Sequence, residues 1–114
     1  MAEYNSSCQT LDQRMSYVLQ ALEKAGLKED TLVILTTDHG IAFPYMKCNL
    51  TDFGTGVFLM MRGPGEFNQH QVIDSLVSQV DVFPTLCDYL NIEKPDRLQG
   101  HSLLPLITGK PNQV

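Results

Sequence analysis

An acidic side chain and an imidazole stand next to each other at Asp38 and His39, after a short apolar run and before Gly40. A carboxylate oxygen and a neutral imidazole nitrogen can both coordinate a divalent cation. A glycine after them allows a sharp backbone turn, so that both side chains can converge on one point. A purely structural interpretation also fits this tripeptide, with Asp38 capping a turn and His39 half-buried. Its wider sequence context must therefore decide between the two interpretations.

Lys47 follows in a stretch with many glycine, proline, asparagine and aspartate residues, which is typical of a loop. A lysine in a loop is ordinarily exposed to solvent. Its surroundings are more specific, because residues 47–56 (KCNLTDFGTG) precede an apolar segment and then residues 62–65 (RGPG). The order of an Asp-His-Gly tripeptide, a lysine, a glycine-containing run and RGPG is the pattern on which the functional interpretation depends.

This order resembles the sulfatase family of the alkaline-phosphatase superfamily. Its members carry a strand, then S/T-D-H/N-G, then a lysine that opens K-x-x-x-Y-E-x-G-x-R-x-P, and then R-x-P-G. Residues 27–37 look like the lead into the family's metal site, residues 79–86 (QVDVFPTL) like its helix start, and residues 98–106 (LQGHSLLPL) like its x-G-x-S-L-L-P-L segment. The run 38–44 (DHGIAFP) resembles the heparan N-sulfatase-like branch.

The chain departs from the family pattern at four positions and lacks two of its motifs. Thr51 and Asp52 stand in place of tyrosine and glutamate, Gly56 in place of arginine, and Phe58 in place of proline. The C/S-x-P-S-R motif, whose cysteine or serine becomes formylglycine, is absent, and so is the family's N-terminal pair of aspartates. We therefore expect the chain to be the C-terminal part of a sulfatase catalytic domain, inactive alone, with formylglycine in an upstream part.

The resemblance implies hydrolysis of sulfate esters or sulfamates in a sulfated small molecule or glycan. It implies that Asp38 and His39 are metal ligands, for calcium or alternatively for manganese or zinc, and that Lys47 is a catalytic charge on a sulfate oxygen. Two other functions stay open. One is a phosphodiesterase or phosphonate hydrolase of the same superfamily, and the other is a non-catalytic domain that keeps the fold for binding or assembly.

These residues must be positioned by helices and strands, and the sequence pattern predicts one α/β domain over residues 1–114. We expect this domain to be a partial alkaline-phosphatase/sulfatase-like sandwich. Residues 10–13 have the form of a capping box, and apolar residues then recur at helical spacing up to Gly26. The unbroken apolar run 32–35 predicts a parallel strand covered on both faces. In total we expect about three strands (32–35, 57–61, 72–77), three helices (10–25, 81–91, 103–108), a loop (40–56) and loose ends (about 1–9 and 110–114).

Composition excludes several classes of partner. The net charge is -5, from 13 acidic and 8 scattered basic residues, which disfavours nucleic acid. No apolar stretch approaches the roughly 20 residues of a membrane helix. The three cysteines lack metal-binding spacing and are expected to be free thiols. Because about three strands would leave a sheet edge unpaired, we expect the isolated chain to form a homo-oligomer.

Overall fold

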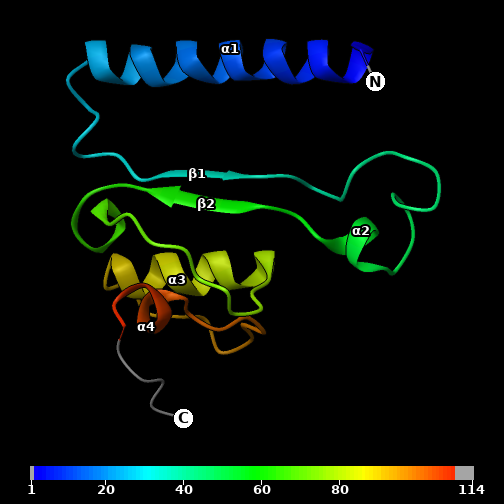
Figure 1. Ribbon diagram of the computed structural model, residues 1–114. Coiled ribbons are helices and arrows are strands. Elements are labelled where there is room, and N and C mark those ends of the chain that lie inside the picture. Colours follow the sequence, from blue (N-terminus) through cyan, green and yellow to red (C-terminus); the bar gives the residue numbers. More distant parts are fainter. Residues whose placement is uncertain (1, 110–114) are drawn as a thin grey trace.

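The computed structural model describes residues 2–109, and it places a two-stranded sheet between one long helix and a group of short helices (Figure 1). The predicted α/β class is confirmed, while the predicted loose end at 110–114 lies outside the described residues. The elements in chain order are α1 (Ala2–Lys24), β1 (Val33–Thr36), α2 (Asp52–Thr55), β2 (Leu59–Arg62), the 3₁₀-helices η1 (Gly65–Asn68) and η2 (Gln79–Asp81), α3 (Val82–Tyr89) and α4 (Leu104–Ile107).

The first helix is longer than predicted. It begins at Ala2, so the segment before Thr10 is helical rather than loose. Thr10 lies inside the helix, where its hydroxyl donates to the Ser6 carbonyl (3.0 Å), and the predicted capping box was therefore wrong. The predicted stop at Gly26 is confirmed, because Gly26 has φ +71° and the next N–H, of Leu27, returns to a carbonyl of the last turn.

The two strands differ from the prediction in direction. β1 pairs antiparallel with β2, from Val33 opposite Arg62 to Thr36 opposite Leu59. The prediction of a parallel strand covered on both faces was wrong, because β1 pairs with the next strand of the chain in the opposite direction and its apolar residues are only partly buried. An apolar run indicates burial and carries no information about the direction of the neighbouring strand. β2 begins two residues later than the predicted strand and ends one residue later.

The third predicted strand, 72–77, does not form. Within the part of the chain that the structure describes, residues 70–77 make no backbone–backbone hydrogen bond, and they belong to no strand. The side chains of Val72 and Leu76 are exposed (89% and 103%). A strand needs a neighbour that satisfies its backbone groups, and no described segment forms backbone hydrogen bonds with this one.

The two C-terminal helices form where the sequence predicts them. α3 carries Pro84 in its first turn, and the chain leaves it through Asn91, which has φ +53°. At the start of α4 the hydroxyl of Ser102 accepts a hydrogen bond from the Leu104 N–H (3.3 Å), and Gly109 ends it with φ +65°. The short helix α2, inside the predicted loop, was not predicted.

The core lies on the side of the sheet that faces α3 and α4 (Figure 1). Phe67, Leu103 and Ile107 are its buried members. The rings of Phe67 and Tyr89 meet edge to face with centroids 4.9 Å apart, a favoured aromatic geometry, and the Tyr89 hydroxyl donates to the Pro64 carbonyl (3.1 Å). Half-buried side chains complete the core: Leu32, Leu59, Met61 and Leu106.

A set of hydrogen bonds around Asp81 and Thr85, here called the Asp81–Thr85 knot, joins the start of α3 to the segment before α4. The Asp81 carboxylate accepts the N–H groups of Ser78 (2.7 Å) and His101 (2.8 Å). The Thr85 hydroxyl donates to the Asp81 carbonyl (2.6 Å) and accepts the Leu103 N–H (2.8 Å). Ser78 and Asp81 thus form a capping box that the sequence analysis did not recognise.

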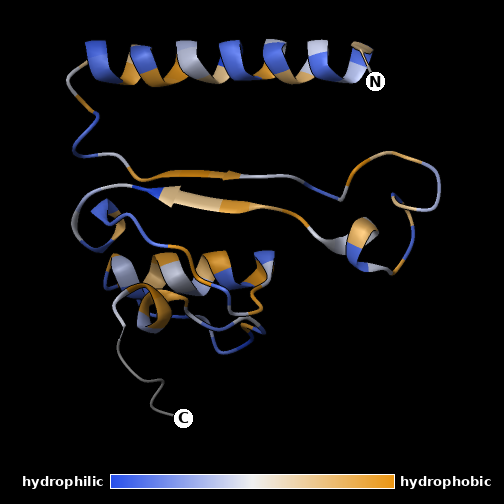
Figure 2. Cartoon of the chain, viewed as in Figure 1, coloured by the Kyte–Doolittle hydropathy of each residue, from blue (hydrophilic) through white to orange (hydrophobic). Residues whose placement is uncertain are grey.

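Much apolar surface remains uncovered. The accessible surface is 9371 Å², whereas a folded monomer of this mass exposes about 6,300 Å². The radius of gyration is 16.5 Å, against about 13 Å for a compact chain of this length. No residue of α1 is buried, although apolar side chains recur along it (Figure 2). Among the described residues, no helix has both the length and the apolar character of a membrane span.

From this exposed apolar surface we expect the isolated chain to self-associate, as its unpaired sheet edges also suggest. Light scattering over a range of concentrations should show a mass above 12.8 kDa, and a hydrophobic dye should bind. A monodisperse monomer that unfolds cooperatively and binds no dye would contradict this expectation.

The Asp81–Thr85 knot leads to a stability prediction. Thr85→Val keeps the shape of the fully buried Thr85 side chain (0% exposed) but leaves the Leu103 N–H without its acceptor. An unsatisfied buried donor costs about 1–3 kcal/mol, so urea-induced unfolding should show a loss of that size. Thr85→Ser retains the hydroxyl and is the matched control. Equal losses for both variants would show that the hydroxyl contributes nothing.

Candidate functional site

Asp38 and His39, here called the Asp38–His39 pair, follow the carboxyl end of β1. The Oδ1 atom of Asp38 lies 3.6 Å from the Nε2 atom of His39. The Asp38 side chain is 88% exposed and that of His39 is 35% exposed. The Nδ1 atom of His39 lies 2.7 Å from the Gly40 carbonyl oxygen, which can only accept a hydrogen bond. In the neutral imidazole Nδ1 therefore carries the proton, and the lone pair of Nε2 is free to coordinate a metal.

The spacing of these two donor atoms suits a shared cation. Ligands about 2.1–2.4 Å from one ion, at angles between a right angle and the tetrahedral angle, lie about 3.0–3.9 Å apart. The 3.6 Å between Asp38 Oδ1 and His39 Nε2 is within this range. Among residues 2–109 no group of three or more His, Cys, Asp or Glu side chains is gathered as a metal cluster. The pair can therefore supply only part of a coordination shell.

Gly40 and Gly54 form the neck of the loop that follows the pair. The Gly40 N–H donates to the Gly54 carbonyl (3.0 Å). A Cβ atom on Gly40 would collide with the Phe53 carbonyl oxygen, and one on Gly54 would collide with the carbonyl oxygens of Asn49 and Met46. Gly40 does not have a positive φ, so close backbone approach, rather than the predicted sharp turn, is what requires glycine there.

Lys47 lies in this loop with its side chain exposed. Its N–H donates to the Ile41 carbonyl (3.2 Å), and its carbonyl accepts from the Asn49 side chain (3.3 Å). Within the described residues its ammonium has no carboxylate within 4.0 Å. The structure thus places Lys47 in the closed loop that directly follows the Asp38–His39 pair, and among the described residues no ion pair joins its ammonium to Asp38.

The loop is held in a defined shape. Tyr45 and Cys48, on either side of the lysine, have φ of +65° and +68°. Non-glycine residues in this left-handed region are strained and occur preferentially at functional sites. Earlier in the loop, the ring of Phe43 lies against the ring of Tyr4 in α1, with the centroids 5.4 Å apart. This aromatic contact joins the loop to α1. A hydrogen bond with the Cys8 thiol raises the pKa of Tyr4.

Gln79 contacts the strand end that carries the pair, and the sequence analysis did not identify it. Its side-chain Nε2 donates to the Thr36 hydroxyl (3.0 Å) and to the Thr37 carbonyl. The Thr36 hydroxyl in turn donates to the Phe58 carbonyl (2.7 Å). Gln79 is the first residue of the run 79–86 (QVDVFPTL) that resembles the family's helix start, and the family pattern specifies no residue type at that position.

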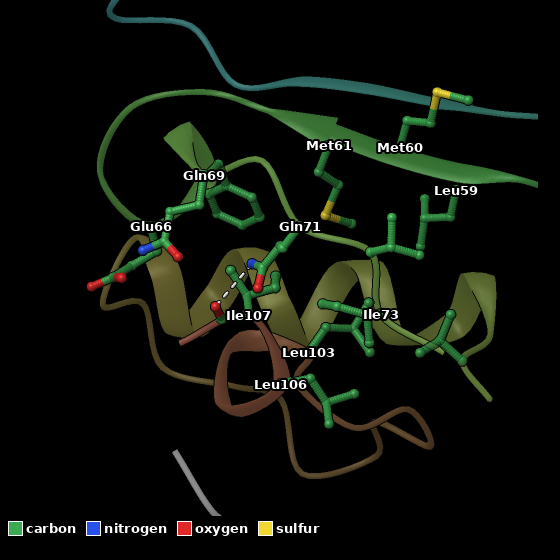
Figure 3. A pocket seen from close by; sticks show the side chains of 13 residues that line it. Leu59, Met60, Met61, Glu66, Gln69, Gln71, Ile73, Leu103, Leu106 and Ile107 are labelled. Carbon is green, nitrogen blue, oxygen red and sulfur yellow. Dashed lines mark hydrogen bonds between the residues drawn. The ribbon is translucent and has the colours of Figure 1, made fainter. Parts of the chain in front are cut away.

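A separate hollow of about 420 Å³ lies between β2 and α4 (Figure 3). Apolar side chains dominate its lining, and the Gln71 amide donates across it to the Ile107 carbonyl (2.9 Å). Neither the Asp38–His39 pair nor Lys47 lines this hollow. The candidate site is therefore the open end of β1 and the loop after it, not the hollow.

Comparisons with known proteins identify the family. A family model described as Sulfatase matches residues 1–92. The chain is 38% identical over 111 residues to the N-sulphoglucosamine sulphohydrolase of Homo sapiens, which covers 89% of this chain and 22% of that protein. It is 37% identical over 109 residues to arylsulfatase K of Rattus norvegicus, covering 92% of this chain and 19% of that protein. The chain thus spans about a fifth of the length of these relatives.

Solved structures agree. A putative sulfatase from Bacteroides thetaiotaomicron superimposes with a TM-score of 0.78 at 29% identity, over 91% of this chain and 24% of that one. A phosphonate monoester hydrolase from Silicibacter pomeroyi superimposes with a TM-score of 0.77 at 29% identity, over 90% of this chain and 21% of that one. The match of the family model over most of the chain confirms the resemblance of its motifs, and the chain belongs to the sulfatase family.

Proposed function

We propose that this chain supplies part of the active site of a hydrolase that cleaves sulfate esters or sulfamates. Asp38 and His39 would be two ligands of a divalent metal, and Lys47 would bind a sulfate oxygen. The observation that carries the proposal is the convergence of Asp38 Oδ1 and His39 Nε2 at the end of β1, in a chain of the sulfatase family.

The Asp38–His39 pair is suited to hold a hard or borderline cation. The exposed Asp38 carboxylate is an oxygen donor of the kind calcium prefers, whereas the His39 imidazole keeps manganese and zinc as alternatives. The bond from Nδ1 to the Gly40 carbonyl orients the ring and presents Nε2 as the ligand atom. A bound cation would neutralise negative charge on the sulfate oxygens.

Lys47 would complement this charge from the loop. Its ammonium is a compact charge on a flexible stem, and the closed neck at Gly40 and Gly54 limits how far the loop can move. A preorganised cation at a position where negative charge develops lowers the barrier of the chemical step. The nucleophile, formylglycine in this family, would come from outside these 114 residues, and the substrate would be a sulfated small molecule or glycan.

Phosphonate hydrolysis is the second candidate, because the fold also superimposes on a phosphonate monoester hydrolase. The complete enzyme should be assayed with an aryl sulfate and with an aryl phosphonate monoester, and its metal content should be measured. Turnover of the sulfate with one calcium ion supports the proposed function. Preferred turnover of the phosphonate with a pair of zinc ions would replace it by the second candidate.

Substitution of Asp38 tests the metal site. Asp38→Ala in the complete enzyme should abolish turnover and metal binding, with little change in the thermal unfolding temperature because the side chain is exposed. The matched control is Asp96→Ala, another exposed carboxylate. The isolated chain should bind calcium weakly or not at all at millimolar concentration, since two ligands fall short of the about 6–8 oxygens calcium prefers. Micromolar binding to the isolated chain, lost in Asp38→Ala, would contradict a partial site.

Substitution of Lys47 tests the sulfate contact. Lys47→Ala should lower kcat/KM about 10²- to 10³-fold without a comparable loss of stability, as expected for the removal of one preorganised charge. Lys47→Arg should retain only part of the wild-type kcat/KM, because a planar guanidinium does not reproduce a compact ammonium. Lys24→Ala, an exposed lysine on α1, is the control. A loss of kcat/KM below about threefold in Lys47→Ala would show that Lys47 is a solvent-exposed lysine without a role in sulfate binding.

A further inference from the structure

We propose that Gln79 is a positioning residue for the Asp38–His39 pair, holding the end of β1 from which both side chains emerge. This inference rests on the proposed function, because it concerns the same metal site. It assigns a role in that site to a residue more than forty positions away in the chain.

The hydrogen bonds of Gln79 form a consistent network. The side-chain amide nitrogen carries two hydrogens, and both have acceptors, the Thr36 hydroxyl oxygen at 3.0 Å and the Thr37 carbonyl. The Thr36 hydroxyl accepts a hydrogen bond from Gln79 and donates one to the Phe58 carbonyl (2.7 Å). One glutamine side chain thus joins the end of β1, the entry to β2 and η2.

The contact with Gln79 restrains the end of β1 because the hydrogen bonds between β1 and β2 end before the Asp38–His39 pair. The last paired residues are Thr36 and Leu59, so Thr37 and the Asp38–His39 pair lie beyond the sheet. The bond to the Thr37 carbonyl restrains the peptide unit that leads directly into Asp38. Displacement of a reacting geometry by about 1 Å can cost about a hundredfold in rate, so this restraint bears on catalysis.

Gln79 can serve as an anchor because its own backbone is held firmly. It lies in η2 between Ser78 and Asp81, whose reciprocal hydrogen bonds form the capping box. On the far side, Gly100 packs so closely against the Val80 carbonyl that a Cβ atom would collide with it. The Asp81–Thr85 knot therefore supports η2, and Gln79 transmits this support to β1.

The experiment compares two glutamines that each bond a distant carbonyl. Gln79→Met removes the amide at the candidate site, and Gln71→Met removes the amide that donates to the Ile107 carbonyl (2.9 Å), away from the site. Thr36→Val removes the intermediate hydroxyl, and Thr36→Ser keeps it. For each variant of the complete enzyme we would measure calcium affinity, kcat, KM, the unfolding temperature and hydrogen exchange of the Gly40 amide, which is bonded to the Gly54 carbonyl.

We expect Gln79→Met to weaken calcium binding about tenfold, to lower kcat more than it changes KM, and to accelerate exchange at Gly40. Thr36→Val should have a smaller effect, because the bond from Gln79 to the Thr37 carbonyl remains. The double variant should lose about as much affinity as Gln79→Met alone, and Thr36→Ser should retain most of the affinity. Gln71→Met should alter only the unfolding temperature. Equal calcium affinity and Gly40 exchange in Gln79→Met and Gln71→Met would overturn the inference.

Failure of the proposed function would be recognised separately. If the unsubstituted enzyme binds none of calcium, manganese and zinc, the assignment of the Asp38–His39 pair is wrong. The Gly40 exchange rate then decides the structural part of the inference by itself. Faster exchange in Gln79→Met than in Gln71→Met supports the link from η2 to β1, and equal exchange rates overturn it.

Discussion

The packing of the C-terminal half depends mainly on the two hydrogen bonds of the buried Thr85 hydroxyl. This hydroxyl donates to the Asp81 carbonyl and accepts the Leu103 N–H, so it joins α3 to the segment that enters α4. This junction holds the segment before α4 against α3, where Leu103 and Ile107 pack with Phe67 in the small core. A hydroxyl with no contact to solvent must have both its donor and its acceptor roles satisfied, and here both are satisfied by backbone groups.

The same junction extends toward the candidate site. The Asp81 carboxylate accepts the N–H groups of Ser78, just before η2, and of His101, just after Gly100, so hydrogen bonds hold the backbone around Gln79. The Asp38–His39 pair is therefore bounded by a glutamine contact before it and by the Gly40–Gly54 neck after it. These contacts restrain the backbone on both sides of the pair, which is what our proposed metal site requires.

The uncovered apolar surface bears on how the chain can function. α1 has no buried residue, and the segment 70–77 exposes apolar side chains without backbone partners among the described residues. Exposure of each such apolar surface to water is unfavourable in free energy, and the surface is available to another segment or molecule. Relatives of about five times this length contain further sequence, and a shared active site with metal ligands from two parts of one domain is consistent with our proposal.

The sequence by itself determined the family and the α/β class, and it indicated the candidate site at Asp38 and His39. Gly26 and Gly109 as helix stops, and Pro84 in the first turn of α3, depend on contacts within a few residues, which local patterns encode. Tertiary structure alone decided the strand direction, the absence of a third strand and the contact of Gln79 with β1. These depend on which distant backbone groups meet, and a strand such as 72–77 cannot form without a partner, however favourable its own sequence.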